Sequence, residues 1–207
     1  MSRCLVCGNG PSLRDVRNDT LDRFTTFGAN RIYLKYEPTY YCFVDPMLGR
    51  ANHRFIDEIN GLKSVKYIGS EFAPEIEDCV PLNCIHRMGF SFSPLDYIYT
   101  YFSVTTAMLQ LAYMMGFEQV GLVGMDHRYI TPNGERAFHT ASEDRNHFTR
   151  DYYADYLNAW KAPKLDKLEE WFKLAKKEYD RNGREIVNLT PDSGLNIFRH
   201  EKLEDWL

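Results

Sequence analysis

The residues with the clearest chemical potential form a glycine-rich loop near the N-terminus. Glycines let a phosphate approach the backbone closely, and a helix that follows such a loop offers free N–H groups and the positive end of its dipole. Leu13 stands at the third glycine of the dinucleotide fingerprint, and no Lys-Ser/Thr pair makes a Walker loop. The pattern predicts a local anion site, or alternatively a tight strand-to-helix turn without a ligand. The five loop residues are Gly8, Asn9, Gly10, Pro11 and Ser12.

A long polar stretch in the second half of the chain is the other concentration of reactive side chains. It runs from His127 to about Tyr153, and a connection of this length in a compact domain is usually functional or mobile. His127 and His139 lack a metal-binding spacing with carboxylates, so no zinc site is predicted. Just before the stretch, Asp126 ends a buried strand, where its carboxylate either orients a ribose or anchors the loop backbone.

Elements that can position these residues follow from the apolar pattern. Short apolar runs closed by polar residues predict buried strands. A helix should follow the glycine loop, capped by Ser12 and with Asp15 completing a capping box. Prolines interrupt the pattern between residues 70 and 94. The predicted strands are 4–7, 25–29, 40–44, 65–68, 84–88, 119–123 and 185–189; the later predicted helices are 48–60, 105–115, 163–183 and a short one ending at 207.

Strands that alternate with helices predict an α/β fold, with a mostly parallel sheet covered by helices on both faces. The length fits a single domain, 1–207, with a lid segment at about 127–160. Ligands of such sheets bind beyond the carboxyl ends of the strands. That rule gathers the glycine loop, Asn30, Asp45, Asp126 and 190–193 on one rim.

Composition excludes several classes of protein. Lys and Arg total 25 against 29 Asp and Glu, a net charge of −4 without a basic block, so a nucleic-acid partner is not predicted. The absence of a long apolar segment predicts neither a membrane span nor an exported chain. Five scattered cysteines fit the cytoplasm, and Cys4 and Cys7 have redox spacing but lie in an apolar run. The aromatic content of 14% is compatible with a homo-oligomer.

Four segments together resemble the bacterial single-domain sialyltransferases: GNGPSL, FGANRIYL, YYCFVDP and SVTTAMLQLAYMMGFEQVGLVGMDHRY. They are also similar to a wider superfamily that includes motility-associated flagellin glycosyltransferases and archaeal hydroxymethylpterin pyrophosphokinases. The resemblance covers roughly 3–45 and 102–129, and weakly 190–198. It implies a Rossmann-like fold, a CMP-activated nonulosonic acid such as CMP-sialic acid as donor, and no metal or other cofactor.

The resemblance also implies donor-binding roles. Asn9 and the glycine loop would contact the nucleotide, and Asn30 would hold the phosphate or the leaving-group oxygen. Ser103 and Thr105 fall at the start of a helix where the family contacts the sugar carboxylate. Asp45 stands where the sialyltransferases have Asn, so a carboxylate that binds ribose or magnesium remains an alternative to a phosphate-facing amide.

Catalytic roles follow from the same resemblance. The sialyltransferases carry a histidine that acts as general base and two tyrosines that stabilise the departing phosphate. The family's base falls on Asp151, and His147 is the alternative that we favour, because an imidazole titrates near neutrality. Tyr129, Tyr152 and Tyr153 are the candidate phosphate donors.

The leading interpretation is a glycosyltransferase that moves a nonulosonic acid from CMP to a sugar hydroxyl of a glycan acceptor, with inversion. The pocket stabilises the departing CMP and His147 removes the acceptor proton. One alternative is an ATP- and magnesium-dependent pyrophosphokinase of the same superfamily, with Asp45 and Asp126 as metal ligands. The other is a non-catalytic nucleotide-sugar-binding protein.

Overall fold

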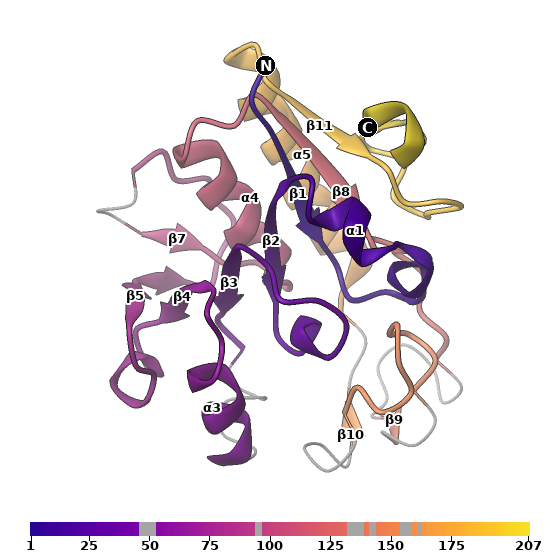
Figure 1. The fold of residues 1–207 in the computed structure, drawn as a ribbon. Coiled ribbons are helices and arrows are strands. Elements are labelled where there is room, and N and C mark those ends of the chain that lie inside the picture. The colour runs from indigo at the N-terminus through magenta and orange to yellow at the C-terminus, as the bar shows by residue number, and fades with distance from the viewer. Residues whose placement is uncertain (46–52, 94–96, 132–138, 141–143, 154–158, 161–162) are drawn as a thin grey trace.

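A parallel sheet of eight strands forms the centre of the molecule in the part of the chain that the computed structural model describes, residues 1–45, 53–93, 97–131, 139–140, 144–153, 159–160 and 163–207 (Figure 1). The strand order is β12-β11-β8-β1-β2-β3-β4-β5, and every pairing is parallel. The strands are β1 (Arg3–Cys7), β2 (Thr25–Ala29), β3 (Tyr40–Phe43), β4 (Val65–Gly69), β5 (Cys79–Leu82), β8 (Gln119–Val123), β11 (Glu185–Asn188) and β12 (Arg199–His200).

Helices cover both faces of this sheet, as the sequence predicts. One face packs against α4 and α5, and the other against α1, α3 and the 3-10 helices η1 and η5. The helices are α1 (Asn18–Leu21), α3 (His53–Asn60), α4 (Thr105–Met114) and α5 (Leu165–Arg181), with the 3-10 helices η1 (Pro11–Asp15), η2 (Ile32–Leu34), η3 (Ala73–Glu75) and η5 (Leu203–Trp206). None of the helices in the described residues is long and apolar enough to cross a membrane.

Side chains along β1 point alternately to the two faces of the sheet, and each face has its own hydrophobic core. Cys4 belongs to the core under α4 and α5, and Cys7 belongs to the core on the opposite face. Burial raises the pKa of both thiols, that of Cys7 to about 12. The two cysteines therefore act as small apolar core residues on opposite faces, not as a redox pair.

Strand order reverses at β1, and this reversal creates the place where a ligand can bind. From β1 the chain builds outward through β2, β3, β4 and β5, and then returns to add β8 on the other side. Cys7 at the end of β1 pairs with Val123 at the end of β8. In open parallel sheets, ligands bind in the crevice beyond the carboxyl ends of the strands at such a point.

The elements differ from the predictions in three places. The single helix expected after the glycine loop is replaced by η1 and the four-residue α1, because Val16 between them is extended. The edge strands β5 and β12 are absent from the prediction, since β5 contains Pro81 and exposes two of its four residues, and β12 has two residues. The short C-terminal helix is a 3-10 helix.

Two small sheets complete the described structure. β6 (Cys84–Ile85) pairs in parallel with β7 (Ile98–Tyr99), and β9 (His139–Thr140) pairs antiparallel with β10 (Ala159–Trp160). β9 and β10 belong to the segment expected as a lid, and Figure 1 shows this segment at the end of the sheet toward which β1 and β8 run. Other parts of that segment lie outside the described residues.

Candidate functional site

Two loops meet at the switch point, one after β1 and one after β8. The Gly8 N–H donates to the Val123 carbonyl at 2.8 Å, and the Gly10 N–H donates to the Gly124 carbonyl at 2.9 Å. A Cβ on Gly8 would lie 2.4 Å from the Gly124 oxygen, and a Cβ on Gly124 would lie 2.5 Å from the Gly8 oxygen. Gly124 also has a φ of +67°. These glycines are therefore needed for the contact between the two loops.

Asp126 fastens the same two loops together. Its Oδ1 accepts the Ser12 N–H at 3.1 Å, and its Oδ2 accepts the Ser12 hydroxyl at 2.8 Å. A Cβ on Gly10 would lie 2.0 Å from Oδ2. Because Ser12 is engaged in this way, the helix cap expected from it does not form, and Asp15 is exposed. The Asp126 carboxylate thus occupies the Ser12 N–H and hydroxyl, which the sequence pattern predicts to serve an anion site and a helix cap.

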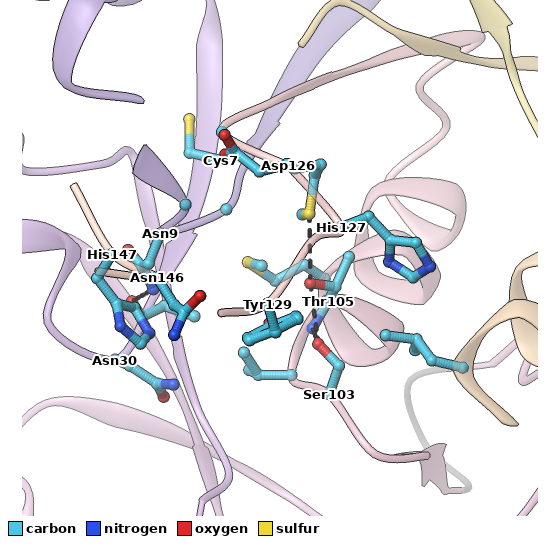
Figure 2. A pocket seen from close by; sticks show the side chains of 18 of the residues that line it. Cys7, Asn9, Asn30, Ser103, Thr105, Asp126, His127, Tyr129, Asn146 and His147 are labelled. Carbon is cyan, nitrogen blue, oxygen red and sulfur yellow. Dashed lines mark hydrogen bonds between the residues drawn. The ribbon is translucent and has the colours of Figure 1, made fainter. Parts of the chain in front are cut away.

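Two adjoining cavities open next to these loops. The first, of about 130 Å³, lies between the loops after β1 and β8 and the start of α4. The second, of about 470 Å³, extends past β3 toward β7. They share Asn30, Ser103, Val104, Tyr129 and His147, so they form one continuous site. In Figure 2, Asn9, Asn30, Asn146 and His147 lie on one side of the first cavity, and Ser103, Thr105 and Tyr129 lie across from them.

Two asparagine amides present unused oxygens at the first cavity. The Asn9 Nδ2 donates to the Ala29 carbonyl at 3.0 Å, which orients its amide. Asn30 has a φ of +53°, a conformation that Asn tolerates, and its carbonyl accepts the Tyr41 hydroxyl at 2.7 Å. Both Oδ1 atoms are buried without a hydrogen-bond partner in the described part of the chain. Buried polar atoms are rarely left unpaired, so these two point to a polar ligand.

The start of α4 supplies the opposite wall. The Ser103 Oγ accepts the Thr105 N–H at 3.2 Å and lies 3.1 Å from the Thr105 hydroxyl. Phe102, just before them, has a φ of +57°, which is uncommon for an aromatic residue. The turn that begins the helix is therefore held in a strained form, and both hydroxyls line the first cavity.

A carboxylate–imidazole pair lies on the wall shared by the two cavities. The His147 Nδ1 is 2.6 Å from the Asp144 Oδ2, and the Asp144 side chain is 0% exposed. The other Asp144 oxygen, Oδ1, accepts the Asn146 N–H at 2.9 Å. With Asp144 as the acceptor from Nδ1–H, the neutral imidazole would carry its lone pair on Nε2, and Nε2 has no hydrogen-bond partner among the described residues. This geometry is that of an oriented general base.

The segment that carries this pair is tied to both loops. Its Phe148 N–H donates to the Asn9 carbonyl at 3.0 Å. The Asn146 amide accepts the Ile130 N–H at 2.6 Å and donates to the Ile130 carbonyl at 3.0 Å. The imidazole is therefore positioned by the glycine loop and by the chain after β8, although 144–153 contains no helix or strand.

The three candidate tyrosines all lie near this imidazole, in different ways. Tyr152 is 1% exposed and its ring stacks on His147, with centroids 3.9 Å apart. Tyr153 meets the same imidazole edge-on at 5.1 Å and lines the second cavity. Tyr129 lines both cavities, and burial raises the pKa of its hydroxyl to about 12. Burial also raises the pKa of the other two, so all three are O–H donors at neutral pH.

The remaining predicted residues fall in different places. Asp45 lines the second cavity, while Asp126 lines the first cavity and a third one of about 1040 Å³ on the far side of the glycine loop. Pro11 and Ser12 line only this third cavity. Asp151 is exposed and is not among the described residues that line the first two cavities. No three His, Cys, Asp or Glu side chains of the described residues are grouped so that they could hold a metal ion.

Sequence reasoning missed Asp144, the partner of His147. The sequence shows only that Asp144 stands three residues before His147. That spacing predicts a side-chain contact in a regular helix, but this segment is not helical. It also missed His86, which lines the second cavity with its Nδ1 2.6 Å from the Thr100 hydroxyl.

Comparison with protein-family models gives no match, and neither does comparison with curated proteins. Among solved structures, the chain is similar to the MAf glycosyltransferase from Magnetospirillum magneticum AMB-1, with a TM-score of 0.63 and 14% sequence identity. The match covers 98% of this chain and 34% of that protein, so the chain spans about a third of its length. At this identity the likeness shows the fold, and it agrees with the predicted Rossmann-like α/β architecture.

Proposed function

We propose that this chain is a glycosyltransferase that moves a nonulosonic acid from a CMP-activated donor to a sugar hydroxyl. The observation that carries the proposal is the Asp144–His147 pair, whose free Nε2 lies on the wall shared by two adjoining cavities at the switch point of the sheet. The fold resemblance to a protein named as a glycosyltransferase supports the same class.

In the proposed reaction, the acceptor hydroxyl gives its proton to the His147 Nε2. The acceptor oxygen forms a bond to the anomeric carbon while the bond from that carbon to the CMP phosphate oxygen breaks. The bonding electrons leave with CMP, and the configuration at the anomeric carbon inverts. The Asp144 carboxylate stabilises the imidazolium that results.

Neutral donors would stabilise the departing phosphate. The Tyr129 hydroxyl remains protonated because burial raises its pKa to about 12. The Ser103 and Thr105 hydroxyls lie at the start of α4, where the helix dipole favours negative charge. The unpaired Oδ1 atoms of Asn9 and Asn30 would accept hydroxyl protons of the donor. Together with Arg128, which also lines the first cavity, these groups would hold an anionic donor.

The test combines binding with turnover in three proteins: wild type, His147→Gln and the control His200→Gln, which lies on β12 away from the cavities. CMP at ~100 times its dissociation constant should add roughly 2.7 kcal/mol and raise Tm by several degrees in all three, without magnesium. Transfer from CMP-sialic acid to a sugar acceptor should fall at least about 100-fold in His147→Gln alone.

Three results would overturn the proposal. Stabilisation by ATP only in the presence of magnesium would replace it with the pyrophosphokinase. Full transfer by His147→Gln would remove His147 as the base. Stabilisation by CMP with no transfer to any acceptor would replace the enzyme with a nucleotide-sugar-binding protein.

A further inference from the structure

We propose that Arg31 is a positioning residue for His147 and acts through the ring of Tyr152. This inference rests on the proposed function, in which His147 is the base. Arg31 lies two residues after the end of β2, in the turn that begins η2, whereas His147 belongs to a segment without regular structure. The contacts of Arg31 join these two parts of the site.

Arg31 binds the backbone of the segment that carries the base. Its Nη1 donates to the Tyr152 carbonyl at 2.6 Å and to the Asp151 carbonyl at 3.1 Å. Its backbone N–H points at the Tyr152 hydroxyl oxygen, 3.4 Å away. Arg31 is 4% exposed, so water does not compete for these contacts. Both ends of Tyr152 therefore contact one buried residue in the turn between β2 and η2.

Tyr152 transmits this position to the imidazole. Its ring lies nearly parallel to that of His147, with an interplanar angle of 8° and centroids 3.9 Å apart. Asp144 holds one edge of the imidazole through Nδ1, and Tyr152 covers one face. With an edge and a face fixed, the ring has little freedom to rotate, and Nε2 stays directed at the cavities.

The charge of Arg31 is balanced from a third element. Its Nη2 lies 3.7 Å from the Glu58 Oε2 on α3, and that oxygen also accepts the Tyr33 hydroxyl at 2.7 Å. A guanidinium can bind a carboxylate and two carbonyls at once because its donors form a planar fork, which a lysine ammonium cannot reproduce. The contact therefore depends on arginine specifically, not on positive charge alone.

Arg31→Lys is the informative variant, with Arg184→Lys as the matched control. Arg184 also donates to a main-chain carbonyl, that of Tyr113, and lies over the Tyr113 ring at 4.2 Å, but it is not among the described residues that line the cavities. In Arg31→Lys we expect kcat for transfer to fall about tenfold with KM for CMP-sialic acid nearly unchanged. The control should keep both values.

A second readout does not need activity. Nitrogen-15 NMR of the histidine side chains, with the His147 signals assigned by their loss in His147→Gln, reports which ring nitrogen carries the proton. In wild type His147 should be a single Nδ1–H tautomer. In Arg31→Lys and in Tyr152→Leu it should become a mixture, whereas Tyr152→Phe, which keeps the ring, should retain most of the selection.

The two readouts separate the two proposals. A wild-type tautomer signal in both Arg31→Lys and Tyr152→Leu would overturn the positioning role whatever the activity. A mixed tautomer in those variants, in a protein whose wild type transfers no sugar, would retain the positioning contact and reject the function. Should Arg31→Lys fail to fold, the comparison of Tyr152→Leu with Tyr152→Phe still decides whether the stacked ring holds the imidazole.

Discussion

The glycine loop after β1 and the segment 144–153 meet at the same cavity but are built in opposite ways. The loop satisfies its backbone donors internally: the Gly8 N–H binds the last residue of β8, the Gly10 N–H binds Gly124 just after it, and Ser12 binds Asp126. The segment has no helix or strand, and its side chains hold the imidazole of His147 with Nε2 free. The loop therefore builds the site mainly through its backbone, whereas the segment contributes a side chain whose nitrogen is available to a ligand.

This contrast changes the meaning of the most recognisable motif. Glycines in a strand-to-helix loop indicate close approach, but a sequence does not say to what. In this molecule the nearest atoms to Gly8 and Gly10 belong to Gly124 and Asp126. The loop thus contributes to the site through Asn9, whose amide faces the cavity, more than through its glycines.

The largest effect should come from the contact between the two loops. Gly124→Ala adds a Cβ 2.5 Å from the Gly8 oxygen at a φ of +67°. We expect it to lower the free energy of unfolding by about 3–5 kcal/mol, the sum of left-handed strain and overpacking. Thermal unfolding should show Tm lower by about 10 °C.

Gly116→Ala is the matched control for that variant. Gly116 also has a positive φ, +85°, but no atom lies within 4 Å of its Cβ position. Strain alone should cost about 1 kcal/mol there. If the two variants were equally destabilised, the close approach of the loops would carry no energetic weight.

A kinetic effect should identify the segment 144–153 as the reactive region. Asp144→Asn removes the carboxylate that accepts from the His147 Nδ1, so the imidazolium formed in the reaction loses its stabilising charge. We expect kcat/KM for transfer to fall about 100-fold, which is about 2.7 kcal/mol, while CMP binding is retained. Steady-state kinetics with a CMP titration would measure both, and equal losses in binding and turnover would contradict the assignment.

A smaller loss of stability should identify Asp126 as a structural carboxylate. Asp126→Asn replaces one oxygen that accepts from Ser12 with an amide nitrogen, so one donor faces another. The expected cost is about 2 kcal/mol in urea unfolding. Asp15→Asn, at the exposed last residue of η1, should stay within about 0.5 kcal/mol. A comparable loss in Asp15→Asn would instead support the predicted capping box between Ser12 and Asp15.

The smallest effect concerns His127, which lines the first cavity and contacts Glu169 of α5. Burial lowers the pKa of its imidazole, although a hydrogen bond with Glu169 opposes the shift. Below the unfolded value of about 6.5, the unfolded state therefore binds more protons, and stability is lost as pH falls through that window. His127→Gln should show a smaller decrease in Tm than wild type between pH 7.5 and 5.5. If His127→Gln lost as much Tm as wild type over this pH range, other groups would be responsible for the pH dependence.

Much of the fold could be predicted because buried parallel strands are continuous apolar runs. The predicted strands 25–29 and 119–123 agree with β2 and β8 at both ends. Failures occur where that signal weakens. β5 lies at the sheet edge, carries Pro81 and exposes Val80, so it lacks the apolar run of a central strand.

The site could be predicted only as separate residues. Strand ends gave Asn9 and Asn30, because the ends of parallel strands meet at one edge of a sheet. The pairs that organise the chemistry, Asp144 with His147 and Arg31 with Tyr152, follow no repeat in the sequence. The second pair joins residues 121 apart, and only the folded chain brings them together.

The sequence separation of these contacts also has a consequence for how the molecule is made. Ser12 and Asp126 are 114 residues apart, and β1 lies in the centre of the sheet beside β8. During synthesis β1 cannot pair with β8 until more than half of the chain has been made. Closing such a large loop is slow because of its entropic cost. We therefore expect the cavities to be among the last features to form, so that binding of the proposed CMP donor would report the completion of folding.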